Sequence, residues 1–235
     1  MTNETLALVG AAAAAGLIHT IIGPDHYVPF VMMAWARKWS GVKTAIITFL
    51  CGIGHVASSV ILGLVGITMG LAVGNLESFE SRRGDIAAWL LLSFGLAYLV
   101  WGIRKAIKNK PHTHHHFHPE NGEHDHEHIH RDQHTHVHSE KMASITPWAL
   151  FTIFIFGPCE ILIPLFMYPA TKSSLFDAVI VTVVFAVVTI STMLALVLAG
   201  VKGFKFINFR GLERYVHIIS GATIAICGIL IMLGL

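Results

Sequence analysis

Long apolar stretches alternate with short polar ones along this chain. Several of the stretches reach the roughly 20 apolar residues that a helix needs to cross a membrane. We expect six spans, at about 6–36, 42–73, 86–107, 145–170, 175–200 and 215–235. A polar segment at 109–144 separates the first three spans from the last three. The pattern predicts an all-α membrane protein.

Two of the predicted spans are interrupted in the same way. Gly23-Pro24 breaks the first span and Gly157-Pro158 breaks the fourth. Irregular backbone is tolerated at membrane depth only where it is buried in protein or lines a cavity. Broken helices in corresponding positions of two halves point to a binding site near the midplane.

The two halves of the chain resemble one another beyond the breaks. Pro24 and His55 are as far apart in the sequence as Pro158 and Thr189. Three spans per half place the two halves upside down relative to each other in the bilayer. The predicted organisation is a first three-helix repeat at 1–108, a His-rich disordered cytoplasmic loop at 109–144 and a second three-helix repeat at 145–235.

Composition supports a membrane protein over a soluble helical bundle. The 235 residues are 54% hydrophobic and only 13% charged, whereas charged residues make up about 25% of a typical soluble protein. The net charge of +2 gives no indication of nucleic acid binding. The three cysteines fit neither a disulfide framework nor a CxxC site. The N-terminus has no basic region before its apolar run, so we expect no cleaved signal peptide.

Lysine and arginine predict the orientation. They concentrate in the segments after the first, third and fifth spans. Because cytoplasmic loops carry an excess of these residues, we expect the N- and C-termini outside and the His-rich loop in the cytoplasm. The expected location is a bacterial inner membrane.

The first break carries the strongest candidate site, formed by His19, Asp25 and His26. Imidazole and carboxylate groups bind divalent transition metals, and the break can bring these side chains together. The alternative is a pair of hydrogen-bonded histidines at a helix end, with Asp25 as an N-cap. His55, alone in the second span, is a further candidate ligand or a packing residue.

The second break carries Cys159 and Glu160. A glutamate inside a membrane is a functional candidate by default, here as a metal ligand or a proton acceptor. Cys159 is a candidate soft ligand, although free cysteine is also a common small buried apolar residue. The alternative for the whole segment is a kinked packing helix.

The polar loop holds twelve of the 16 histidines, between His112 and His138. Interleaved with acidic residues and threonine, they predict weak, exchangeable metal sites without a fixed geometry. A pH sensor is the alternative. His217, near the basic end of the last span, is expected to be interfacial.

The segment 16–26, which contains His19 and ends in Asp25-His26, resembles the UreH-type transporters of the LysE superfamily, which are linked to nickel supply. Gly52-Ile53-Gly54-His55 resembles a second-span motif of that superfamily's exporters. Phe156-Gly157-Pro158-Cys159-Glu160 resembles the second-half motif of the UreH branch. The resemblance implies six spans in two inverted repeats and transport of a divalent transition metal. Thiol–disulfide carriers of the cytochrome-maturation type need a cysteine beside the proline in each half, and Asp25 stands where the first would be.

These observations together predict a secondary transporter of nickel or cobalt, with zinc as a further candidate, and not an enzyme. The metal would bind His19, Asp25, His26, His55, Glu160 and Cys159 and be gated by alternating access. We expect no catalytic cofactor. The expected partners are the metal and membrane lipid, with a homo-oligomer and a cytoplasmic metallochaperone as further candidates. Two alternatives remain open: a metal-binding or metal-sensing membrane protein without transport, and a thiol–disulfide electron carrier.

Overall fold

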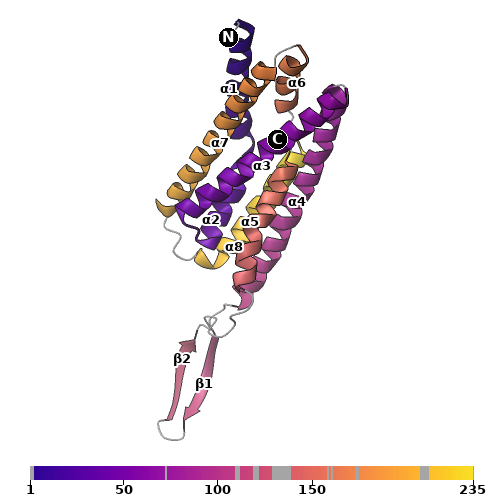
Figure 1. Cartoon of the computed structure of the whole chain (residues 1–235). Helices are drawn as coiled ribbons and strands as arrows, with labels where there is room; N and C mark the ends of the chain where they lie inside the picture. The colour runs from indigo at the N-terminus through magenta and orange to yellow at the C-terminus, as the bar shows by residue number, and fades with distance from the viewer. Residues whose placement is uncertain are drawn as a thin grey trace.

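Long helices make up most of the chain and lie side by side in an elongated bundle (Figure 1). The computed structural model describes residues 3–71, 73–108, 112–118, 122–128, 139–157, 159, 161–172, 175–206 and 212–234. The elements are α1 Asn3–Ile22, η1 Pro24–His26, α2 Val28–Arg37, α3 Gly41–Thr68, α4 Val73–Lys108, β1 His112–His118, β2 Gly122–His128, α5 Ser139–Phe156, α6 Leu162–Lys172, α7 Leu175–Phe206, η2 Glu213–Tyr215 and α8 Val216–Met232.

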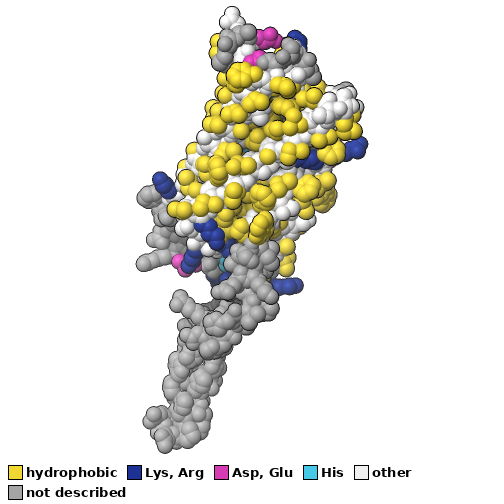
Figure 2. All heavy atoms as spheres, in the orientation of Figure 1, with side chains coloured by type: hydrophobic (Ala, Val, Ile, Leu, Met, Phe, Trp, Pro, Cys, Tyr) yellow, Lys and Arg dark blue, Asp and Glu magenta, His cyan; other side chains and the backbone are white. Residues whose placement is uncertain are grey.

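Five helical segments of the described chain are long and apolar enough to cross a membrane. They are α1, α3, α4, α7 and the segment Glu213–Met232. The protein is therefore a multi-pass helical membrane protein, and apolar side chains cover much of the bundle surface in Figure 2. The fourth of the six predicted spans is not among these five candidates, because the second break divides it into the shorter helices α5 and α6. The apolar part of α5, Thr146–Phe156, is too short to be a candidate span alone.

The segment between the second and third predicted spans is largely helical. Helix α3 ends at Thr68, Gly70 turns the chain with a φ of 65°, and α4 begins at Val73. The first turns of α4 are polar in sequence, which is why apolarity alone placed this helix's start too late. They are nevertheless helical because one face is buried, through Leu76 and Glu80.

Helices α4 and α8 form the most extensive helix pair, and glycines allow their backbones to approach closely. A Cβ at Gly102 would lie 2.8 Å from the His217 backbone, and one at Gly228 would lie 2.7 Å from the Leu92 nitrogen. Small residues permit such close packing where lipid supplies no hydrophobic driving force. The pair therefore depends on the absence of side chains at these positions.

Many of the other helix contacts also join the two halves of the chain. Helix α1 packs on α7, and α3 packs on both α5 and α7, while α2 packs on α8. The largest apolar cluster includes Phe30, Met33, Leu150 and Phe154, all buried. It lies beside the two breaks, so both breaks are anchored on the same core.

Part of the His-rich segment forms a two-stranded antiparallel hairpin. Strands β1 and β2 pair with His112 opposite His128 and His118 opposite Gly122. A hairpin satisfies its backbone hydrogen bonds locally and needs no core to do so. Figure 1 shows it beyond the end of the bundle at which α4 ends. The rest of the predicted disordered loop at 109–144, apart from the start of α5, lies outside the described residues.

Candidate functional site

The first break turns the chain just after α1. The Gly23 N–H donates to the His19 carbonyl at 3.0 Å, and the His26 N–H donates to the Gly23 carbonyl at 3.1 Å. Pro24, which cannot continue the α-helix, opens the 3-10 turn η1. The turn brings the His26 ring to 4.5 Å from the His19 ring, measured between centroids. Glycine is required at position 23, because a Cβ there would lie 2.6 Å from His26 Nδ1.

His55 completes a cluster of three imidazoles. It lies in the middle of α3, and its ring centroid is 5.2 Å from that of His26 and 6.2 Å from that of His19. His26 and His55 are each only 2% exposed. One ring nitrogen from each of the three histidines lies within 4.8 Å of the others. Residues that are distant in the sequence therefore converge on one point.

The second break lies against this cluster. A Cβ at Gly157 would be 3.1 Å from His55 Nδ1, so glycine lets the broken end of α5 approach the imidazole. The Phe154 ring stands 6.2 Å from His55 and 6.4 Å from His26. The two Gly-Pro breaks thus form two sides of one site, although Pro158 and Glu160 lie outside the described residues.

Hydrogen bonds fix which nitrogen of two rings carries a proton. His26 Nδ1 lies 3.2 Å from the Gly23 carbonyl and 3.1 Å from Asp25 Oδ1. His55 Nδ1 lies 3.4 Å from the Phe154 carbonyl. Carbonyl and carboxylate oxygens accept and do not donate. Both Nδ1 atoms are therefore the donors, which leaves each neutral ring with a lone pair on Nε2.

Among the described residues, the three Nε2 atoms have no hydrogen-bond partner. Those of His19, His26 and His55 are all buried and unpaired within the described chain. An unsatisfied buried polar atom costs about 1–3 kcal/mol. One ring nitrogen from each histidine lies within 4.8 Å of the others, and three imidazole nitrogens are a donor set that a transition-metal ion accepts. Metal-binding histidines typically donate the other ring N–H to a carboxylate or carbonyl, as His26 and His55 do here. The three histidines therefore have the donor atoms and the supporting hydrogen bonds that a bound transition-metal ion requires.

The other predicted ligands take different places. Asp25 contacts the outer edge of His26 and is not among the three clustered ligand residues. Cys159 is fully buried in an apolar cluster with Val56 and Leu162, and its carbonyl accepts the Leu162 N–H at the start of α6. Glu160 lies outside the described residues, so its predicted role as ligand or proton acceptor remains a prediction.

Two residues near the site were missed by sequence reasoning, which placed them in a loop. Glu80 and Arg83 are 0% and 8% exposed, on the inner face of α4. They lie between Leu76 and Ala87, which are buried on the same face. The spacing of these four positions follows the helical period of 3.6 residues. That periodicity, extended through the polar segment, is the signal that could have found them.

Comparison with known proteins identifies one family. Residues 28–230 match the family model described as cytochrome C biogenesis protein transmembrane region. No curated protein and no solved structure matches the chain.

This match overturns the resemblance to UreH-type transporters of the LysE superfamily, and with it the prediction of a nickel or cobalt transporter. It favours instead the alternative of a thiol–disulfide electron carrier of the cytochrome-maturation type. The motifs behind the resemblance are short and centre on Gly-Pro breaks, which any polar site between broken membrane helices requires. The strongest of them, at His19 and Asp25-His26, precedes the matched residues. The chain belongs to the cytochrome C biogenesis protein transmembrane region family.

Proposed function

We propose that this chain is a cytochrome c biogenesis-type membrane protein that holds a transition-metal ion at His19, His26 and His55. The proposal rests on which nitrogen of each imidazole has a hydrogen-bond partner. The Nε2 atoms are buried and have no partner in the part of the chain that the structure describes, while His26 and His55 use Nδ1 to donate to oxygen atoms. The proposed role is to bind the ion, without transporting it across the membrane.

The chemistry of the donor set favours zinc or copper. Three neutral imidazoles suit both metals, and zinc sites with three protein ligands keep a fourth position open. Zinc–nitrogen bonds are about 2.0–2.1 Å long, so three nitrogens that lie within 4.8 Å of one another need only a modest inward shift to bind one ion. When bound, the ion would act as a Lewis acid or, if copper, as a one-electron centre.

The arrangement of helices supports two inverted repeats around this site. The first helix of the first half, α1, packs on α7, and the first helix of the second half, α5, packs on α3. Helices α4 and α8, the last of each half, pack on one another. These reciprocal contacts are those of two similar units related by a two-fold axis in the membrane plane.

The distribution of charge supports a cytoplasmic side at the hairpin end of the bundle, in a bacterial inner membrane. Figure 2 shows Lys and Arg side chains toward both ends of the bundle, with most of them near the hairpin end. Contacts of Arg37 with Thr146 and of Lys105 with His217 place the adjoining ends of four helices together there. An excess of these residues marks the cytoplasmic side.

Metal titration of the purified full-length protein in detergent tests the proposal. The twelve histidines of the His-rich segment are first replaced by asparagine, so that they contribute no background. We expect this protein to bind one Zn²⁺ or Cu²⁺ tightly, with X-ray absorption showing imidazole ligands. His26→Ala and His55→Ala should each weaken binding by more than about tenfold, because each removes one of three ligands.

His217→Ala is the matched control. This histidine is also in a membrane helix, but its ring contacts Tyr98 and Trp101 and not the cluster. Metal affinity should be unchanged in this variant. Equal affinity in the His26, His55 and His217 variants would refute the three-histidine site.

Thiol–disulfide transfer is a second candidate function, favoured by the family and by the place of Cys159. This thiol directly follows the second break and is fully buried. As a thiolate it would attack a partner's disulfide, form a mixed disulfide and release one partner thiolate. A second thiol must then resolve the mixed disulfide. Cys51 and Cys227 belong to a different apolar cluster from Cys159, so the resolving thiol would be the partner's.

Trapping of mixed disulfides separates the two candidates. Cells expressing the protein are quenched with acid, alkylated and analysed for cross-linked species. Thiol transfer predicts that Cys159→Ser loses the cross-linked species while Cys51→Ser and Cys227→Ser keep it. Absence of any trapped species in the parent protein would remove this candidate and leave the metal site.

A further inference from the structure

A buried ion pair on α4 stands beside the histidine cluster. Arg83 Nη1 donates to Glu80 Oε2 at 2.8 Å, and both side chains are on the inner face of the helix. Charges inside a membrane protein are expensive and are usually functional. A buried pair is also weak evidence for stability, because desolvation offsets the attraction between the charges. The pair therefore calls for a specific role.

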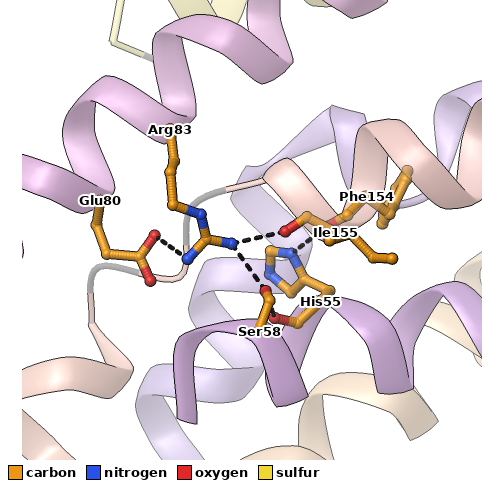
Figure 3. A network of polar contacts seen from close by, with 6 residues as sticks. All are labelled: His55, Ser58, Glu80, Arg83, Phe154 and Ile155. Atoms are coloured by element: carbon orange, nitrogen blue, oxygen red, sulfur yellow. Dashed lines mark hydrogen bonds and ion pairs between the residues drawn. The ribbon is translucent and has the colours of Figure 1, made fainter. Parts of the chain in front are cut away.

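The second nitrogen of the guanidinium joins two other helices. Arg83 Nη2 donates to the Ile155 carbonyl of α5 at 2.6 Å and to Ser58 Oγ of α3 at 2.8 Å. Figure 3 shows the side chain reaching from α4 to both. The planar, multidentate guanidinium can hold several acceptors at fixed angles, which a lysine cannot. One side chain thus connects three helices.

Both acceptors adjoin the contacts of His55. The Ser58 hydroxyl donates to the His55 carbonyl at 2.8 Å, on the same helix. Ile155 directly follows Phe154, whose carbonyl accepts the His55 Nδ1–H. Arg83 therefore reaches His55 by two routes, one through α3 and one through the end of α5 (Figure 3).

The end of α5 explains why donors are needed here. The helix stops at Phe156, so the carbonyls of its last turn lack the regular backbone donors that a continuing helix would supply. Among the described residues, the Phe154 carbonyl accepts only the Gly157 N–H of the turn, at 3.1 Å, from the backbone. Hydrocarbon offers no water to satisfy these carbonyls. His55 supplies a donor to one of these carbonyls and Arg83 to the next. The orientation of the imidazole and the position of the broken helix end are thereby fixed together.

We propose that Arg83, held in place by Glu80, is a positioning residue that keeps the proton of His55 on Nδ1 and directs its Nε2 into the histidine cluster. The effect of Arg83 on metal affinity rests on the proposed function. Its effect on the position of the His55 ring proton does not. Arg83 itself lies outside the cluster of three ligand residues.

Nitrogen NMR of the metal-free, full-length protein with ¹⁵N-labelled histidine tests the positioning directly. The His55 signals are identified by their loss in His55→Gln. We expect the parent to show a protonated Nδ1 and an unprotonated Nε2. The double variant Glu80→Gln with Arg83→Met removes both charges and keeps similar volume, and it should show a mixture of the two tautomers. Arg82→Met, an exposed neighbour on α4, is the matched control and should match the parent.

Zn²⁺ affinity of the same proteins gives the second readout. Loss of a group that orients a ligand typically weakens metal binding by about 10–100-fold, and we expect a loss in this range for the double variant and none for Arg82→Met. A parent that binds neither Zn²⁺ nor Cu²⁺ would refute the proposed function, while a changed tautomer would still support the positioning role. An unchanged tautomer in the double variant would overturn the positioning role, whatever the affinity.

Ser58→Ala keeps the experiment decisive if the double variant does not fold. It leaves the ion pair and the Ile155 contact in place and removes only the route through α3. We expect a smaller shift in the tautomer ratio in the same direction. A His55 signal identical to that of the parent would count against the two-route mechanism.

Discussion

At the scale of single residues, the site depends on which ring nitrogens of the histidines form hydrogen bonds and which do not. His26 and His55 each donate from Nδ1 to an oxygen atom, and the Nε2 atoms of the cluster have no partner within the described ranges of the chain. Asp25 affects the site through the hydrogen bond that its carboxylate accepts from His26 Nδ1. Its carboxylate would raise the basicity of the ring and hold its orientation, as carboxylates behind metal-binding histidines do.

Asp25→Asn tests this role. The amide oxygen can still accept a hydrogen bond from His26 Nδ1, but without the negative charge. We expect metal affinity to fall by about 10–100-fold, with three imidazoles still bound in the X-ray absorption spectrum. Loss of an oxygen ligand from that spectrum would show instead that Asp25 is a direct ligand, as the sequence suggested.

At the scale of elements, the two Gly-Pro breaks do more than interrupt helices. Each places a glycine against the Nδ1 side of a clustered histidine: Gly23 against His26 and Gly157 against His55. The breaks also free backbone carbonyls, which the same imidazoles satisfy. The site is therefore made by the ends of helices as much as by side chains.

Gly23→Ala should disrupt the site locally. The added Cβ would be 2.6 Å from His26 Nδ1, so the imidazole must move. We expect metal affinity to fall at least tenfold, and a loss of stability of about 1–3 kcal/mol, typical of overpacking. Metal titration and thermal unfolding in detergent measure the two effects.

Gly10→Ala is the control for this prediction, because a Cβ at that position of α1 meets nothing within 4 Å. It should bind metal like the parent and be as stable or slightly more so, since alanine favours helix. If both variants bind metal equally well, the close approach at Gly23 does not control the site.

At the scale of the whole molecule, the packing joins the two halves of the chain around the site. His19 and His26 come from the first break, His55 comes from α3, and the end of α5 closes one side. Lys and Arg side chains are seen toward both ends of the bundle in Figure 2, with most of them near the hairpin end. If the halves are inverted repeats, both termini must lie on the side opposite the hairpin end.

Cysteine labelling tests this orientation. Glu4→Cys and Lys202→Cys place exposed thiols near opposite ends of the bundle, while the three native cysteines are buried. An impermeant maleimide should label position 4 in cells with a permeable outer envelope and an intact inner membrane. Position 202 should react only after that membrane is opened. The reverse pattern would invert the proposed topology.

Much of the fold and part of the site followed from local sequence. The membrane class follows from apolar length alone, because hydrocarbon excludes unpaired backbone groups. The breaks follow from Gly-Pro, whose effect on a helix is local. His19, His26 and His55 were candidates because ionisable groups are rare in apolar spans. The family did not follow, since short motifs at broken helices reflect the needs of a polar site and not descent.

Tertiary structure alone decided which of these groups meet and what each does. The helical turns before the third predicted span, with Glu80 and Arg83 on their inner face, looked like a polar loop because charge dominates their composition. Only packing against α3 and α5 makes that face an interior one. Likewise, the sequence by itself determined that imidazoles stand at a break, but the direction of each Nε2 depends on acceptors distant in the chain. Hydrogen-bond partners across helices are set by three-dimensional packing, which local sequence does not encode.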